Sequence, residues 1–158
     1  MKRTLGTIVA LAATVLAVVP TVAGAEQTRE TYKAQVEPIC AANRQANERI
    51  MAGARERVNK GDLAPAGGQF IRASDSVGKL AKQLAAVPAP AGDERRISRW
   101  LQLIRLLKTR LHNVGKYFKA GEEIKGTHES ILAERAGLSA NNISIVFHFR
   151  ACRFNRVG

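Results

Sequence analysis

The stretch ISRWLQLIRLLKTRLHNVGKYF, residues 97–118, decides the fold class of this chain. Its large apolar residues recur at intervals of three and four, which is the period of an α-helix that buries one face. They are Ile97, Trp100, Leu101, Ile104, Leu107, Leu111, Val114 and Phe118. Gly121 follows the last of them and predicts the end of the helix, because glycine is the usual residue just beyond a helix C-terminus.

Two earlier stretches have the same period. Residues 31–60 carry apolar or small side chains at helical spacing and end at a glycine. Residues 63–87 do so again, after Asp62, which can cap a helix. The proline- and glycine-rich loop VPAPAG at 87–92 then separates this helix from the next, which Asp93 can cap.

A fourth apolar segment, residues 124–147, is less regular. Gly126 and Gly137 interrupt its pattern, and glycines also weaken the predicted helix at 63–87. The run ISIVFHF at 143–149 alternates as a strand would. Because no other segment offers a strand partner, we expect a helix here.

Four helices with short connections predict an all-α fold, an up-down-up-down four-helix bundle. In this topology the start of the first helix and the end of the fourth meet at the same end of the bundle. The only two cysteines, Cys40 and Cys152, lie at those two places. We expect a disulfide between them that joins the start of the first helix to the C-terminal tail. A three-helix core with a strapped-on tail is the alternative architecture.

The N-terminus has the three-part layout of a secretory signal, with basic residues, an apolar run at 5–19 and small residues at 23–25. The run is shorter than the roughly 20 residues that a membrane-spanning helix needs. We therefore expect a signal peptide at 1–25 and a single helical-bundle domain at 26–158. The protein would then be secreted to the medium or the cell envelope with no membrane span after cleavage, where an oxidising environment favours the disulfide.

Two motifs resemble those of a known group. VEPIC at 36–40 and CRF at 152–154 are similar to motifs in a group of small secreted bacterial helical proteins, of actinobacterial type and unassigned function. The resemblance spans essentially the whole chain after the signal, although the final FNRVG departs from it. It implies secretion, a helical fold and the pairing of Cys40 with Cys152. It implies no activity, cofactor or catalytic residue.

The chain has no motif that would support catalysis. There is no G-x-S-x-G nucleophile turn, and the adjacent Glu122 and Glu123 cannot face each other on one turn. His112 and His128 could form a partial metal site with Glu129, but no H-x-x-x-H or E-x-x-H spacing supports it. We therefore expect no enzymatic activity, no metal and no cofactor.

Asparagines on the predicted helix faces suggest a polar layer inside the bundle. Asn43 and Asn47 share one face of the first helix, and Asn141 and Asn142 would lie at a similar height on the fourth. We expect a polar core layer of Asn43, Asn47 and Asn142. Such a layer can line a ligand pocket, but it more often fixes the register between helices, and we expect the second function here.

The chain is strongly basic, with 25 Lys and Arg against 13 Asp and Glu and a formal net charge of +12. In the predicted bundle six arginines gather at one end, partly offset by Glu37 and Glu94. They are Arg95, Arg96, Arg99, Arg150, Arg153 and Arg156. Guanidinium groups grip phosphate and carboxylate, so we expect an anionic envelope polymer or lipid headgroups as partner. Aromatic residues are too few for specific nucleic-acid recognition.

Two functions follow from these patterns. The first is a secreted, non-enzymatic protein that binds an anionic partner at the cell envelope, and it predicts a filled core with a basic outer patch. The alternative is a small-ligand or metal carrier that uses the bundle interior. This alternative predicts a cavity lined by Asn43, Asn47 or the histidines.

Overall fold

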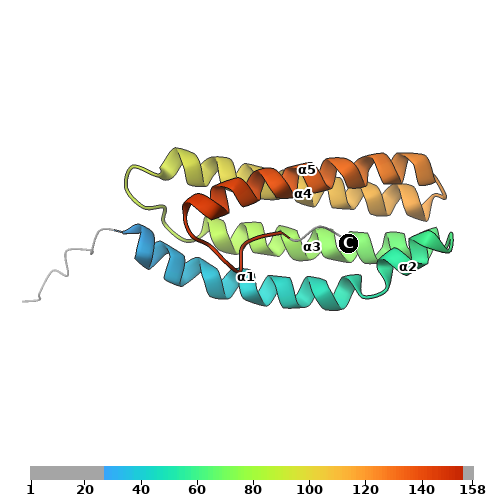
Figure 1. Ribbon diagram of the computed structural model, residues 1–158, viewed down its shortest axis with the longest axis horizontal. Helices are drawn as coiled ribbons and strands as arrows, with labels where there is room; N and C mark the ends of the chain where they lie inside the picture. Colours follow the sequence, from blue (N-terminus) through green and yellow to red (C-terminus); the bar gives the residue numbers. More distant parts are fainter. Residues whose placement is uncertain (1–26, 155–158) are drawn as a thin grey trace, which may run out of the picture.

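The computed structural model describes residues 27–154, which form five α-helices and no strand. The four long helices run alternately in opposite directions, and α3 packs against α1 and α4, while α4 packs against α5 (Figure 1). The helices are α1 (Arg29–Met51), α2 (Ala54–Asn59), α3 (Leu63–Ala85), α4 (Glu94–Lys119) and α5 (Glu123–Val146). The predicted four-helix bundle is therefore confirmed, with α2 as an additional short helix. The predicted signal peptide at 1–25 lies outside the described residues.

The first predicted helix does not continue to residue 60. It stops at Met51, and Gly53 adopts a left-handed conformation with φ 71° before α2 begins. The carbonyl groups of Ile50 and Ala52 accept hydrogen bonds of 2.9 and 2.8 Å from the side-chain amide of Gln69 on α3. Gln69 thus satisfies carbonyls at the end of the helix, which otherwise lack partners. The prediction missed this break because the apolar residues of α2 stay in phase with those of α1.

The fourth predicted helix is continuous. α5 runs from Glu123 to Val146 through both Gly126 and Gly137. The segment that alternates like a strand is helical as far as Val146 and turns only at Phe147. The helix expected at this position is confirmed.

Close approach of the helices explains several of the glycines. A Cβ atom at Gly126 would lie 2.3 Å from the ring of Phe118 on α4. Gly67 of α3 and Gly115 of α4 face each other, and a Cβ on either would lie 2.6 Å from the carbonyl oxygen of the other. These residues therefore let neighbouring backbones and rings come into contact, which outweighs their low helix propensity.

Three helices end in the same way. After α2, α4 and α5, the residue beyond the C-cap is left-handed: Gly61 at φ 78°, Gly121 at φ 72° and His148 at φ 55°. At the end of α5 the amide of His148 donates to Ile145 (3.0 Å) and that of Phe149 donates to Ser144 (2.8 Å). This is the Schellman pattern, in which glycine is the usual left-handed residue. His148 is thus the exception among these three helix ends.

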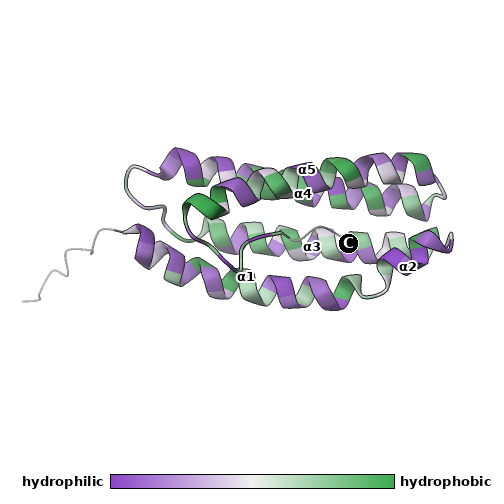
Figure 2. Cartoon of the chain, viewed as in Figure 1, coloured by the Kyte–Doolittle hydropathy of each residue, from purple (hydrophilic) through white to green (hydrophobic). Residues whose placement is uncertain are grey.

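Aromatic side chains fill one end of the bundle. Phe149 is fully buried, and its ring centroid lies 5.2 Å from that of Trp100, 5.3 Å from that of Phe147 and 6.0 Å from that of Tyr32. Figure 2 shows apolar and polar residues alternating around each long helix, with an apolar turn where α5 passes into the tail. The tail after α5 is therefore part of the core.

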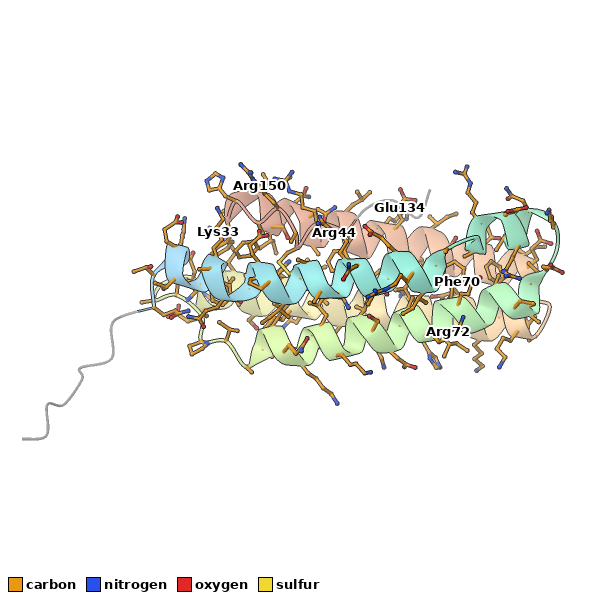
Figure 3. The ribbon with its side chains drawn as sticks, turned by 90° about the horizontal axis from the view of Figure 1, so that it is seen from below. Lys33, Arg44, Phe70, Arg72, Glu134 and Arg150 are labelled. Carbon is orange, nitrogen blue, oxygen red and sulfur yellow. A yellow bond between two sulfur atoms is a disulfide. The ribbon has the colours of Figure 1, made fainter. Side chains whose placement is uncertain are left out.

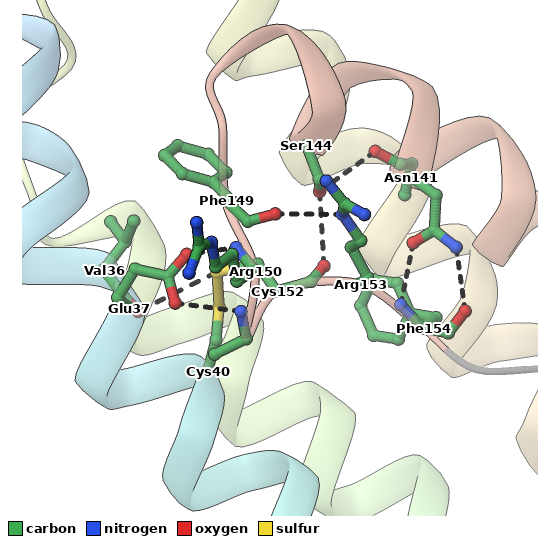
Figure 4. The surroundings of a disulfide bond; sticks show 12 residues. Val36, Glu37, Cys40, Asn141, Ser144, Phe149, Arg150, Cys152, Arg153 and Phe154 are labelled. Atoms are coloured by element: carbon green, nitrogen blue, oxygen red, sulfur yellow. Dashed lines mark hydrogen bonds between the residues drawn. A yellow bond between two sulfur atoms is a disulfide. The ribbon is translucent and has the colours of Figure 1, made fainter.

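The tail is fastened to α1 by the predicted disulfide, which is confirmed. Cys40 and Cys152 are bonded across a sequence separation of 112 residues (Figure 4). Beside this bond the carboxylate of Glu37 accepts hydrogen bonds from the backbone amides of Arg150 and Ala151, the latter at 2.8 Å.

Side chains of α5 hold the other side of the tail. The hydroxyl of Ser144 donates to the carbonyl oxygen of Cys152 at 3.2 Å. The side-chain amide of Asn141 bonds both the amide and the carbonyl of Phe154, at 2.7 and 2.8 Å (Figure 4). The tail is therefore anchored to α1 and to α5 through its own backbone as well as through the disulfide.

Candidate functional site

A cleft with a volume of about 410 Å³ opens between α1 and α5. Its floor is apolar and comes from α3 and α4, through Val77, Leu80, Leu107 and Leu111. The tail closes it beside the disulfide, whereas the end of α1 and the start of α2 line it farther along. The cleft exists because the tail, rather than direct packing of α1 on α5, completes the bundle on this side.

Small residues on α5 keep the cleft from being filled. Ala133 and Gly137 of α5 face it and cannot reach across to α1. Phe154 of the tail lies over Gly137, where a Cβ atom would be 3.4 Å away. Leu138 also lines the cleft and is 41% exposed, so it stands at the rim.

Two asparagines form a polar strip on the α1 wall. The side-chain amide of Asn43 donates to the backbone carbonyl (2.9 Å) and hydroxyl (2.8 Å) of Ser76 on α3, and that of Asn47 donates to the Oδ1 of Asn43 (2.9 Å). Among the described residues, the buried Oδ1 of Asn47 has no hydrogen-bond partner. Asn43 thus ties α1 to α3, and Asn47 extends the polar strip along the wall of the cleft.

The prediction that Asn142 is the third member of the polar layer is wrong. Asn142 is exposed to solvent. Its neighbour Asn141 is half-buried and bonds the tail instead. The rotation of α5 about its axis places only one of two adjacent residues toward the interior, and the sequence alone did not fix that rotation.

Charged side chains ring the cleft: Arg44, Glu48, Arg55, Glu134 and Arg153. The Nε of Arg44 lies 4.0 Å from a carboxylate oxygen of Glu48, a loose pair, and Glu134 has an interaction partner of its own. The Nε of Arg153 donates to a tail carbonyl at 3.1 Å. Figure 3 places Arg44 and Glu134 on the same side of the molecule. Arg55, on α2, forms no ion pair within the described part of the chain.

At the arginine-rich end, one carboxylate engages two arginines. The side chain of Asp93 is only 7% exposed and accepts hydrogen bonds from Arg29 at 2.5 and 2.8 Å and from Arg96 at 3.0 Å. The hydrogen bond from Arg29 lowers the pKa of Asp93, with a further contribution from Arg96. The predicted side-chain cap at Asp93 is absent, because its carboxylate is taken up by these two arginines.

The six predicted arginines do not share one environment. Arg95, Arg99 and Arg150 are exposed at this end, and Arg96 is engaged by Asp93 as described above. Arg153 lines the cleft instead. Arg156 lies outside the described residues. Anion binding at this end therefore stays a prediction with fewer residues to support it.

The partial metal site considered from the sequence has other contacts. Glu129 accepts hydrogen bonds from Arg110 (3.1 Å) and Asn113 (3.3 Å), while His112 and His128 are exposed. Within residues 27–154, no group of three or more His, Cys, Asp or Glu side chains is placed to hold a metal ion. We therefore consider the cleft, and not a metal centre, as the candidate site.

No protein-family model matches the chain, and neither a curated protein nor a solved structure shows significant similarity to it. The resemblance to a group of secreted bacterial proteins thus stays an expectation. In the part of the chain that the structure describes, no helix combines the length and the apolar character that a membrane span requires.

Sequence reasoning found the two asparagines of the site but missed its charged rim. Arg44 and Glu48 directly follow Asn43 and Asn47 in the sequence and so reach the same opening. The available signal was the presence of Asn43 and Asn47 at positions of an apolar helix stripe. Polar residues there indicate that this face of the helix is not wholly packed in an apolar core.

Proposed function

We propose that this protein is a non-enzymatic binding protein that holds a small, largely apolar ligand in the cleft between α1 and α5. The observation that carries the proposal is the apolar floor of this cleft beneath a wall formed by Asn43 and Asn47. The two functions expected from the sequence, an anion-binding protein and a small-ligand carrier, differ in whether Asn43 and Asn47 line a cavity. The cleft lined by these asparagines favours the carrier. Its volume falls within the range of about 300–1,000 Å³ typical of small-molecule sites.

The chemistry of the wall describes the ligand further. Apolar ligand surface that is removed from water by contact with the cleft floor would contribute about 25 cal/mol per Å² to binding, before the costs of association. The polar wall of Asn43 and Asn47 favours a ligand that carries a polar group beside its apolar body. A compact hydrocarbon body with few polar groups fits both features.

Binding of a neutral fluorescent probe, N-phenyl-1-naphthylamine, tests this proposal. Leu138→Trp would place a large side chain over the cleft and should weaken probe binding at least about tenfold. Ile131→Trp is the matched control, since Ile131 lies two turns earlier on α5, is 46% exposed and does not line the cleft. Absence of probe binding to the unmodified protein, or equal losses in both folded variants, would overturn the proposal.

We also propose that the protein acts outside the cytoplasm. The disulfide between Cys40 and Cys152 supports this location weakly, because such bonds persist in oxidising compartments. N-terminal sequencing of the exported protein should begin at Glu26. Recovery of the full-length chain from the cytoplasm alone would refute both the cleavage and the location.

Anion binding at the arginine-rich end is the second candidate. It is favoured by three exposed arginines, Arg95, Arg99 and Arg150, that form no ion pair with any described residue. Their replacement by glutamine should abolish polyphosphate binding at low salt. Replacing three basic residues elsewhere should not, and equal losses would reduce the effect to net charge.

A further inference from the structure

The two ends of the cleft are formed by different parts of the chain. One end is closed by the disulfide and by Ala151 of the tail, with Arg153 next to Cys152 on the rim. At the other end α1 finishes at Met51 and the chain turns into α2, where Arg55 lines the opening. Between Cys40 and Met51 the wall follows α1 for about 16 Å, at 1.5 Å per residue. The cleft is therefore elongated, with the disulfide at its inner end and Arg55 at its mouth.

Of the three arginines on the rim, Arg55 makes the fewest interactions with described residues. Arg44 has a carboxylate of Glu48 at 4.0 Å, and Arg153 uses its Nε on a tail carbonyl. Arg55 is exposed and, within residues 27–154, has no ion pair. A guanidinium at the mouth can bind both oxygens of a carboxylate or phosphate group while that group keeps part of its hydration.

We propose that the ligand is a single-chain acidic amphiphile, whose chain lies on the cleft floor toward the disulfide and whose carboxylate or phosphate head binds Arg55. This inference rests on the proposed function and specifies its ligand class. In the reverse orientation the head would meet Arg153 and Arg44, but the Nε of Arg153 already donates to a tail carbonyl and Arg44 has Glu48 beside it, so Arg55 is the better partner. The excess of basic residues over the whole chain also favours an anionic ligand.

Two acidic residues on the rim could attract a cationic head group, so an acidic ligand has to be compared with a cationic one. Glu48 and Glu134 line the cleft, and each already has a partner, Glu48 in the loose pair with Arg44. A cationic head would have to compete with these partners. The test therefore includes head groups of both signs and a neutral one on the same chain.

The experiment measures displacement of N-phenyl-1-naphthylamine from the full, oxidised protein by dodecanoate, dodecyl phosphate, dodecanol and dodecyltrimethylammonium, all below their micelle concentrations. The acidic ligands should bind about tenfold more tightly than dodecanol, and the cationic one most weakly. Carboxylate and phosphate share the chemistry that Arg55 recognises, and their relative affinities identify which head the site prefers.

Charge reversal locates the head group. Arg55→Glu should weaken dodecanoate and dodecyl phosphate binding about tenfold and leave dodecanol and the probe unchanged. Arg57→Glu is the matched control, because Arg57 is an exposed residue of the same helix that does not line the cleft. Equal effects of both variants, or no preference for an acidic head, would overturn the inference while probe binding still upholds the proposed function. Failure of the unmodified protein to bind the probe would instead refute the proposed function.

Discussion

Replacing His148 by glycine should stabilise the protein. His148 holds the left-handed position at the end of α5, with φ 55°. For a residue with a Cβ atom this conformation costs about 1–2 kcal/mol relative to glycine. Glycine gives back about 0.5–1 kcal/mol through the greater entropy of its unfolded chain. The net gain for His148→Gly is therefore about 0.5–1 kcal/mol, or about 2–4 °C in Tm for a domain of this size.

The side chain of His148 is exposed and makes no hydrogen bond or ion pair with any described residue, so its removal should cost nothing else. Urea denaturation at constant pH measures the difference as a change of midpoint with an unchanged m-value. The reciprocal variant Gly121→His provides the control. Gly121 occupies the equivalent place after α4, with φ 72° and open space around it. This variant should lose a similar amount of stability.

The order of further replacements at position 148 sharpens the test. Asparagine tolerates the left-handed region better than other residues with side chains, whereas valine tolerates it poorly. Stability should therefore fall in the order glycine, asparagine, histidine, valine. A His148→Gly variant that is less stable than the original protein, while Gly121→His behaves as expected, would refute the reasoning. It would mean that the imidazole contributes contacts that outweigh the backbone strain.

Three other perturbations test the remaining structure. Removing the disulfide by the double change Cys40→Ser and Cys152→Ser should cost about 4–5 kcal/mol, given its separation of 112 residues, and two freely alkylated thiols in the oxidised native protein would refute the bond itself. Gly126→Ala should destabilise the protein by about 1–3 kcal/mol, because its Cβ would clash with an aromatic ring. Gly78→Ala should instead stabilise it by up to about 1 kcal/mol, because its Cβ would meet only a lysine side chain at 3.7 Å. A stabilising Gly126→Ala together with a destabilising Gly78→Ala in thermal denaturation would contradict the packing. Burial raises the pKa of Tyr32 to about 12, so the unfolded chain loses this proton first as the pH rises. The free energy of unfolding should therefore fall above about pH 10, by at most about 1.4 kcal/mol per pH unit. Tyr32→Phe should lack this part of the alkaline loss, and identical pH profiles of the two proteins would show that the hydroxyl is not buried.

The helices themselves could be predicted because their signals are local. The apolar stripe of residues 97–118 repeats every three to four residues, and only a helix places such residues on one face. Gly61 and Gly121 marked helix ends for an equally local reason, since glycine reaches the left-handed conformation without strain. The disulfide followed from two cysteines and the direction of four helices.

The glycines inside the helices could be interpreted only with the structure. Propensity alone predicts that Gly67, Gly115 and Gly126 weaken their helices. Each instead lies where a neighbouring helix leaves no room for a Cβ atom. Such contacts join residues far apart in the chain, and no local pattern specifies which helix faces which.

The cleft depended on the tertiary structure even more. α1 stops at Met51 because Gln69, on another helix, satisfies its last carbonyls, and the tail after α5 occupies the space where α1 and α5 would otherwise meet. The sequence by itself determined the four long helical segments apart from the end of α1, their direction and the covalent link between Cys40 and Cys152. Only the tertiary structure decided the rotation of each helix about its axis, and hence that Asn47 and Arg55 line one opening while Asn142 faces solvent. The physical reason is that helix formation depends on spacing within one segment, whereas rotation and packing depend on the shapes of side chains from several segments at once.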